Sequence, residues 1–144
     1  ASASGLFATL TLGRFESLRA DIDDAGAHVL IGVRGGGREL VRVEGMSDGT
    51  CDQLFLALRL ASLQMDLSTA REPIPLVIDD ILIKFDDDRA AAALKVLAAL
   101  SEKTQVIVFT HHEHLAGLAK DTLDEGVLFM HALDGRSPLA TNPV

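Results

Sequence analysis

The spacing of apolar and polar positions predicts β structure in the first third of the chain. Residues 15–22 alternate imperfectly, and residues 27–33 and 40–43 are short runs rich in Val, Leu and Ile. Three glycines at residues 35–37 separate the last two runs, and such a cluster is typical of a tight hairpin. We therefore expect an antiparallel β region over about residues 1–45.

From residue 50 to about residue 65 the spacing becomes helical. Apolar residues surround the helix axis almost completely, and the polar interruptions are Gln53, Arg59 and Gln64. A helix that is apolar nearly all round must be buried on several sides. One small lobe would have difficulty covering it, so this pattern indicates that further protein packs against the helix.

The second half of the chain alternates short apolar runs with helical segments. Residues 74–78 form an unbroken apolar run, which is typical of a strand covered on both faces, and residues 105–109 are predicted to form a second buried strand. Helices are predicted for residues 87–100 and about 113–120, and a last strand is predicted for residues 126–130. This order of strands and helices predicts an α/β fold with a parallel sheet and right-handed crossovers.

Length, composition and charge exclude several classes of protein. The 144 residues have room for about one domain, and 48% hydrophobic with 24% charged residues is typical of a globular protein. No stretch approaches the roughly 20 apolar residues of a bilayer-spanning helix, so we expect no membrane partner. The net charge of −8 repels nucleic acid unless a local basic patch or another part of a parent molecule binds it.

The cysteine content and the first residues bear on the origin of the chain. Cys51 is the only cysteine, so no internal disulfide can form and the reducing cytoplasm is the predicted compartment. The chain begins Ala-Ser-Ala-Ser, with neither an initiator Met nor a secretory leader. We expect it to be a piece of a longer protein.

Polar side chains follow two strands of the predicted sheet. Asp79 and Asp80 come directly after the first apolar run, and Thr110 and His111 follow the second. In open parallel sheets, ligands bind beyond the carboxyl ends of the strands. Carboxylates at that edge can hold Mg²⁺ and orient a water molecule for attack on a phosphate. One Asp alone would be explained as a cap of the next turn, but two favour a functional site.

A short polar segment leads into the apolar helix. Residues 46–53 are Met-Ser-Asp-Gly-Thr-Cys-Asp-Gln. A small hydroxyl residue and a glycine at a helix start leave backbone N–H groups free at the positive end of the helix dipole, which suits a phosphate. Ser47 or Asp48 could instead serve only as an N-cap, and the segment alone does not decide between the two.

Taken in order, these segments resemble the C-terminal half of an ABC-type ATPase head of the SMC, RecN and SbcC kind. Among these, the YhaN-like AAA-family ATPases are the most similar. Residues 46–53 resemble the signature motif Leu-Ser-Gly-Gly-x-x-x-Gln, and residues 76–80 resemble Walker B. A Phe-Asp pair ending at Asp86 lies where the D-loop belongs, and His111 resembles the switch histidine. The resemblance covers about residues 7–130.

At the strand ends, the resemblance implies catalytic and metal-binding roles. Asp79 would hold Mg²⁺, Asp80 would polarise the attacking water, and His111 would sense the γ-phosphate of ATP. Asp80 replaces the usual Glu and has about 1.5 Å less reach. We therefore expect slow turnover unless the backbone lies closer.

At the helix start, the resemblance implies contact with a nucleotide held by a second head. Ser47, Gly49 and Gln53 would form the nucleotide-binding set, in which Ser47 and Gly49 meet the γ-phosphate and Gln53 fixes the helix. Asp86 of the D-loop would connect the two sites across the interface. Asp48 replaces the first glycine of the signature motif. A carboxylate about 4 Å from a phosphate costs on the order of 4 kcal/mol at an effective dielectric of 20, so we expect Asp48 to turn outward or cap the helix.

The P-loop motif of such ATPases is not matched. Residues 32–39 place Arg and Glu where the motif has Lys and Ser or Thr, and the flanking strands indicate a hairpin. In the family the P-loop lies in the N-terminal half, so this chain would hold half of an active site for ATP and Mg²⁺ and would be inactive alone. Its partners would be the P-loop half and a second head, with DNA as a partner of the full-length molecule in DNA repair or chromosome maintenance.

These motifs divide the chain into three parts of a single lobe, residues 1–144. The β region covers about residues 1–45, with residues 5–12 leading into it. The core that carries the four motifs covers residues 46–131. Residues 132–144 are expected to form a loose tail.

Two other functions stay open. A degenerate head lobe would dimerise or bind partners in a nucleotide-dependent way without hydrolysis, as the departures at Asp48 and Asp80 suggest. A stand-alone metal-dependent phosphohydrolase would use Asp79, Asp80 and His111 within one chain. Phosphatase activity of the isolated chain would favour this last function.

A zinc site is the weakest of the candidates. His111 and His114 are neighbours at helical spacing. Zinc requires three or four converging ligands, and the position of Cys51 is too uncertain from the sequence to complete the set.

Overall fold

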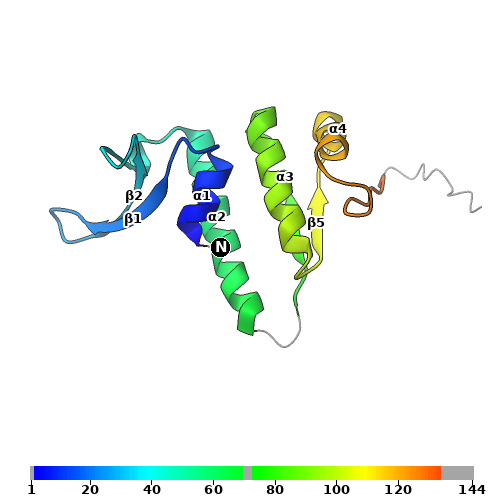
Figure 1. The fold of residues 1–144 in the computed structure, drawn as a ribbon, viewed down its shortest axis with the longest axis horizontal. Coiled ribbons are helices and arrows are strands. Elements are labelled where there is room, and N and C mark those ends of the chain that lie inside the picture. The colour runs from blue at the N-terminus through cyan, green and yellow to red at the C-terminus, as the bar shows by residue number, and fades with distance from the viewer. Residues whose placement is uncertain (1, 70–72, 134–144) are drawn as a thin grey trace, which may run out of the picture.

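The computed structural model describes residues 2–69 and 73–133 (Figure 1). An antiparallel sheet with two helices forms the N-terminal part, and a parallel strand pair with two helices forms the C-terminal part. The elements in chain order are α1 (Ala3–Leu10), β1 (Ser17–Ile22), β2 (His28–Arg34), β3 (Glu39–Arg42), the short 3₁₀ helix η1 (Val43–Gly45), α2 (Asp48–Thr69), β4 (Leu76–Asp79), α3 (Asp87–Ser101), β5 (Val106–Phe109) and α4 (Glu113–Thr122).

Helix α1 corrects the predicted β region of residues 1–45, because it occupies most of the segment that leads into the strands. The Ser2 hydroxyl accepts a hydrogen bond from the Gly5 N–H and caps the helix. Leu6, Phe7 and Leu10 are buried against the rest of the core. Their spacing of one and three residues places them on one helical face, and the predicted β region did not take this helical spacing into account.

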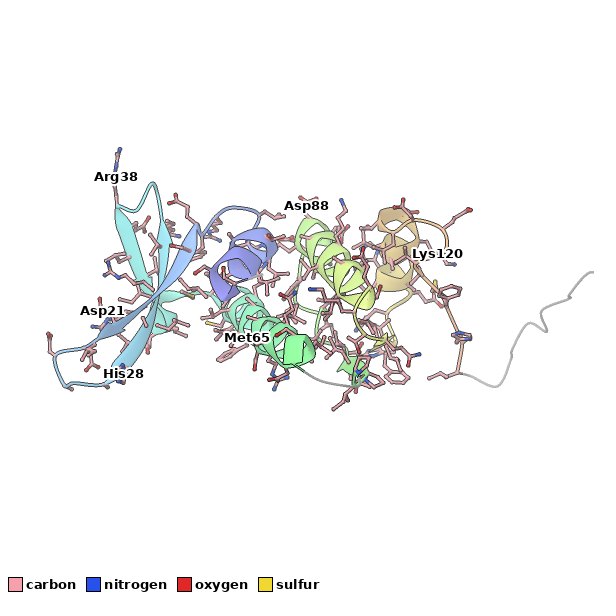
Figure 2. The ribbon with its side chains drawn as sticks, turned by 60° about the horizontal axis from the view of Figure 1, so that its bottom comes forward. Asp21, His28, Arg38, Met65, Asp88 and Lys120 are labelled. Carbon is pink, nitrogen blue, oxygen red and sulfur yellow. The ribbon has the colours of Figure 1, made fainter. Side chains whose placement is uncertain are left out.

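The three strands β1, β2 and β3 form the predicted antiparallel sheet. Its order is β1-β2-β3, and Arg34 pairs with Glu39 across the second hairpin. The three turn glycines have φ angles of 66°, 69° and 81°, which are accessible to glycine at little cost. The predicted hairpin at residues 35–37 is therefore confirmed. Figure 2 shows Arg38 at its tip, extending away from the sheet.

A further glycine in this sheet, Gly32, is in a tightly packed place and offers a test. A Cβ atom there would lie 2.7 Å from the buried Phe15 ring and 2.8 Å from the Met46 methyl group. We expect Gly32→Ala to lower the free energy of unfolding by about 1–3 kcal/mol, measured by urea denaturation, because the ring has no room to move.

Gly117 supplies the matched control for this substitution. It lies within α4, and a Cβ atom added there would meet nothing within 4 Å. Gly117→Ala is expected to raise the free energy of unfolding by about 0.5–1 kcal/mol, because alanine restricts the unfolded chain and suits a helix. Equal effects of the two substitutions would contradict the close packing at Gly32.

Helix α2 is longer than predicted and less buried. Leu54, Leu56, Ala57 and Leu60 are buried, and α1 packs along the helix (Figure 1). However, Phe55 is 58% exposed and Met65, labelled in Figure 2, is 72% exposed. Part of the apolar surface of α2 is thus uncovered in the described chain, which agrees with the expectation that one small lobe would have difficulty covering it.

Strands β4 and β5 pair in parallel, with α3 as the connection between them. Leu76 lies opposite Val106, and Asp79 lies opposite Phe109. Helix α3 packs against β5 and α4, and its buried residues are Ala90, Ala93, Leu94, Leu97 and Leu100. This strand–helix–strand unit confirms the predicted α/β fold class and parallel pairing.

Two predictions for this sheet are wrong. Only Ile78 of the two strands is buried, and Val77 is 57% exposed, so the strands are not covered on both faces in the described chain. Residues 126–130 form no strand, and Phe129 is 76% exposed. An extended segment becomes a strand only with a partner, and no described strand pairs with this one.

The predicted loose tail of residues 132–144 lies almost wholly outside the described residues, which end at residue 133. None of the helices in residues 2–69 and 73–133 combines the length and apolarity that crossing a bilayer requires. The core joins both parts of the chain: it includes Phe7 and Phe15, whose ring centroids are 5.0 Å apart, as well as residues of α2, α3 and α4.

Candidate functional site

The parallel pairing of β4 and β5 brings the polar residues at the strand ends to one edge of the sheet. The Asp80 N–H donates a hydrogen bond of 3.0 Å to the Phe109 carbonyl, which extends the strand pairing by one residue. Asp79 and Asp80 therefore lie beside Thr110 and His111, as we expected from the sequence.

Asp80 is held by both residues that follow β5. The Thr110 hydroxyl donates to Asp80 Oδ1 at 2.8 Å, and His111 Nδ1 lies 2.5 Å from Asp80 Oδ2. The Asp80 side chain is 27% exposed, whereas that of His111 is 72% exposed. Asp80 also has a φ of 45°, in a left-handed region that few residues other than glycine adopt. A strained conformation held by two hydrogen bonds is typical of functional sites.

These contacts determine the protonation state of Asp80. The hydrogen bond from Thr110, and after it the interaction with His111, lower the pKa of the Asp80 carboxyl and outweigh the opposing effect of desolvation. Asp80 is therefore ionised at neutral pH. Since both oxygens accept hydrogen bonds, the group is better suited to orienting a water molecule than to removing a proton from it.

Asp79, one residue earlier, is placed differently. Its side chain is exposed and makes no hydrogen bond or ion pair within the described parts of the chain. Mg²⁺ is commonly held by one or two carboxylates together with water and phosphate oxygens. The exposed carboxylate of Asp79 fits that requirement.

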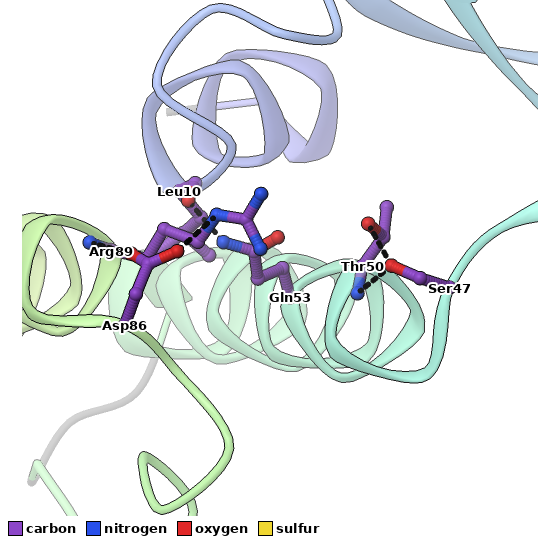
Figure 3. A network of polar contacts seen from close by, with 6 residues as sticks. All are labelled: Leu10, Ser47, Thr50, Gln53, Asp86 and Arg89. Atoms are coloured by element: carbon purple, nitrogen blue, oxygen red, sulfur yellow. Dashed lines mark hydrogen bonds and ion pairs between the residues drawn. The ribbon is translucent and has the colours of Figure 1, made fainter.

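The start of α2 carries the residues predicted to bind a nucleotide. The Ser47 hydroxyl accepts from the Thr50 N–H at 3.4 Å and lies 2.9 Å from the Thr50 hydroxyl (Figure 3). Ser47 thus caps the helix, while its side chain remains exposed, as does that of Asp48. The predicted outward position of Asp48 is observed. Ser47 and Asp48 at this helix start face solvent, whereas Gly49 is half-buried and Thr50 is buried.

The start of α2 lies next to the loop that follows β4. A Cβ atom on Gly49 would approach the Lys84 carbonyl to 3.7 Å, and Lys84 Nζ forms an ion pair of 3.2 Å with Asp52 Oδ2. The segment between Asp80 and α3 is therefore tied to the helix that carries Ser47.

Gln53 is fully buried and has a structural position. Its amide nitrogen donates to the Leu10 carbonyl at the end of α1 (Figure 3), while its Oε1 has no hydrogen-bond partner among the described residues. Gln53 therefore links α2 to α1 and does not face solvent, and its place among the nucleotide-binding residues stays a prediction.

Asp86 directly precedes α3 and caps its N-terminus. Its Oδ1 accepts from the Arg89 N–H at 3.0 Å, and its Oδ2 forms an ion pair of 3.3 Å with Arg89 Nε (Figure 3). The side chain is still 60% exposed, so one face of the carboxylate remains accessible. A D-loop role for Asp86 stays a prediction.

The sequence interpretation missed His112. Asp80, His111 and His112 each offer a ligand atom within 4.8 Å of the others. His112 Nε2 is buried and has no hydrogen-bond partner within the described residues. The tandem histidines after a strand were the available signal, but periodicity alone does not say that adjacent side chains converge.

The zinc set considered from the sequence is not assembled. His114 Nε2 lies 2.7 Å from Asp87 Oδ1, and this carboxylate raises the pKa of the His114 imidazole. Cys51 Sγ lies 3.6 Å from the Val43 carbonyl, and burial, then the nearby Asp48, raise the pKa of the thiol. His111 and His114 therefore have different carboxylate partners, and Cys51 is a poor nucleophile.

The sequence matches no family model. It is similar to YhaN of Bacillus subtilis (strain 168), an uncharacterized protein, with 33% identity over 119 residues that make up 79% of this chain. The chain spans only 11% of the length of YhaN.

The fold is similar to that of SMC head domains. The Smc head domain of Pyrococcus furiosus, solved with an extended coiled coil and bound to the C-terminal domain of ScpA, has a TM-score of 0.61 at 22% identity, over 82% of this chain and 29% of that chain. A structure concerning ATP-driven dimerization and DNA-stimulated activation of SMC ATPases has a TM-score of 0.60 at 20% identity. The match covers 82% of this chain and 72% of that chain. The SMC head domain of Thermotoga maritima has a TM-score of 0.56 at 21% identity, and the match covers 82% of this chain and 39% of that chain. The chain therefore has the fold of an SMC-like head lobe, and YhaN is its relative in sequence.

Proposed function

We propose that the chain is the C-terminal lobe of an ATP-binding head and supplies the Walker B, signature, D-loop and switch-histidine residues. The observation that carries this proposal is the network of Asp80, Thr110 and His111 beside the exposed Asp79 at the ends of β4 and β5. Ligands of open parallel sheets bind at this edge. The proposed lobe comprises residues 1–144.

In this proposal, the residues at the ends of β4 and β5 carry out ATP hydrolysis. Asp79 holds Mg²⁺, which neutralises charge on the phosphates of ATP. Asp80, ionised and aimed by Thr110, orients the attacking water. His111 is exposed and can turn from Asp80 toward a γ-phosphate, which would make their contact sensitive to bound nucleotide.

The start of α2 acts on the nucleotide of a second head. Ser47 and the backbone at Gly49 lie at an exposed helix N-terminus, which attracts a phosphate. Gln53 holds this helix in place through Leu10. Asp86, with one exposed face, contacts the partner head.

The exposed apolar side chains support the proposal that a further lobe packs against this chain. Val77 of β4 and Phe55 of α2 are more than half exposed, and a P-loop half would cover such surfaces and complete the site for ATP and Mg²⁺. The chain alone is then inactive as an ATPase. We propose that the complete protein forms a cytoplasmic dimer of heads and acts on DNA in repair or chromosome maintenance.

A substitution at Ser47 tests this proposal in a head completed with the P-loop half. Ser47→Arg is expected to abolish ATP-dependent dimerisation, measured by analytical ultracentrifugation, because a bulky side chain fills the phosphate position. Since it also removes the helix cap, which is worth about 1 kcal/mol, Ser47→Asp is the sharper variant: it keeps a capping oxygen but repels the phosphate.

Ala25→Arg provides the control, since it adds the same side chain at an exposed position in the turn between β1 and β2. Dimerisation should be unchanged in this variant. If Ser47→Asp also dimerises like the unmodified head, the assignment of the α2 N-terminus is wrong.

A non-hydrolysing head lobe is the second candidate function. Both oxygens of Asp80 are engaged, and its lowered pKa makes it a weak base. Nucleotide-dependent dimerisation without phosphate release from the completed head would favour this function. Phosphatase activity of the isolated chain would instead favour the stand-alone phosphohydrolase.

A further inference from the structure

We infer that Asp80, His111 and His112 form a site for a divalent transition metal of the zinc class, separate in its ligands from the Mg²⁺ position at Asp79. The ligand atoms of these three residues lie within 4.8 Å of one another. Ligands at about 2.1 Å from a tetrahedral zinc are separated by about 3.4 Å, so the more distant ligand atoms would move closer together while Asp80 and His111, now 2.5 Å apart, would separate.

The state of His112 Nε2 is the second observation. This atom is buried and has no hydrogen-bond partner within the described residues. A buried polar atom without a partner costs about 1–3 kcal/mol, so its presence requires an explanation. The ring centroid of His112 lies only 4.0 Å from that of His111, and a metal bound by both imidazoles would account for their close approach.

The donor types decide which metal fits. Two imidazoles and one carboxylate suit zinc and iron, whereas Mg²⁺ prefers oxygen ligands alone. Three protein ligands also leave a fourth position open, which water or a phosphate oxygen can occupy. The remaining histidine of the motif, His114, is engaged by Asp87 and lies outside this set.

Metal binding requires a change at the contact between Asp80 and His111. Their atoms are 2.5 Å apart, with the proton of Nδ1 between them. For Nδ1 to bind the metal through its lone pair, the proton of the neutral ring moves through solvent to Nε2, and the exposed His111 ring moves outward to make room.

One consequence rests on the proposed function. A metal held by Asp80 and His111 withdraws both from the attacking water and the γ-phosphate, so zinc should inhibit ATP hydrolysis by the completed head. Metal binding itself needs neither ATP nor the P-loop half, so it can be tested apart from the proposed function.

The test is a titration of the purified chain with Co²⁺, whose visible absorption bands report ligand geometry. We expect one Co²⁺ per chain, displacement by Zn²⁺ and no displacement by an excess of Mg²⁺. His112→Ala is expected to weaken Co²⁺ binding at least about 10-fold, a loss typical of the groups around a metal. His112→Asn provides a second variant if alanine perturbs the far-ultraviolet circular dichroism.

His114→Ala is the matched control, because it removes a histidine two residues away that contacts Asp87 instead. Its Co²⁺ affinity should equal that of the unmodified chain. Absence of Co²⁺ bands, or equal losses in the variants at positions 112 and 114, would overturn the inference. Co²⁺ binding in a chain whose completed head fails to hydrolyse ATP would support the metal site and count against the proposed function.

Discussion

Asp79→Ala is expected to abolish Mg²⁺-dependent ATP hydrolysis by the head completed with its P-loop half. A bound metal ion supplies several kcal/mol of charge stabilisation in such reactions, so the rate of phosphate release should fall at least about 100-fold. The measurement is phosphate release at saturating ATP and Mg²⁺. Because Asp79 is exposed and makes no polar contact within the described residues, the thermal stability of the variant should not change.

Asp24→Ala is the control for this loss. Asp24 is an exposed carboxylate in the turn between β1 and β2, in the antiparallel sheet rather than at the ends of β4 and β5 (Figure 1). Its removal changes the net charge equally and should leave hydrolysis unaffected. Full hydrolysis by the Asp79→Ala head would place the metal elsewhere and remove the central assignment of the site.

Phe7→Ala is expected to destabilise the chain by about 3–5 kcal/mol, a large share of the stability of a small domain. The Phe7 side chain is fully buried, and its ring packs against that of Phe15. Alanine favours a helix, so the loss would report packing rather than helix propensity. Urea denaturation followed by circular dichroism measures the free energy of unfolding.

Phe55→Ala makes the same substitution on a side chain that is 58% exposed. In the chain studied by itself, its effect should stay below about 1 kcal/mol, as at most surface positions. A loss at Phe7 no larger than that at Phe55 would show that α1 does not anchor the core.

Much of the candidate site followed from local pattern. Asp79 and Asp80 end one apolar run, and Thr110 and His111 end the next. Parallel strands place such ends at one edge, so their proximity was predictable without coordinates. The turn glycines 35–37 likewise predicted the hairpin, because positive φ angles favour glycine wherever they occur.

Other features depended on contacts between distant segments. The same helical pattern placed Gln53 among polar interruptions, yet the structure buries it completely against the end of α1. Residues 126–130 have strand-like composition but form no strand, because strand formation needs a partner with free hydrogen-bonding groups. An apolar run indicates that a segment can be buried, but it does not indicate which other segment or chain covers it.

The sequence by itself thus determined the order of the strands and α-helices from β1 to α4, the hairpin and the edge of the sheet where the acidic residues gather. Only the tertiary structure decided the hydrogen bonds that hold Asp80, the convergence of His112 with His111, and the solvent exposure of Val77. Periodicity and turn chemistry are local properties of the chain, whereas side-chain direction and burial depend on which distant residues the fold brings into contact.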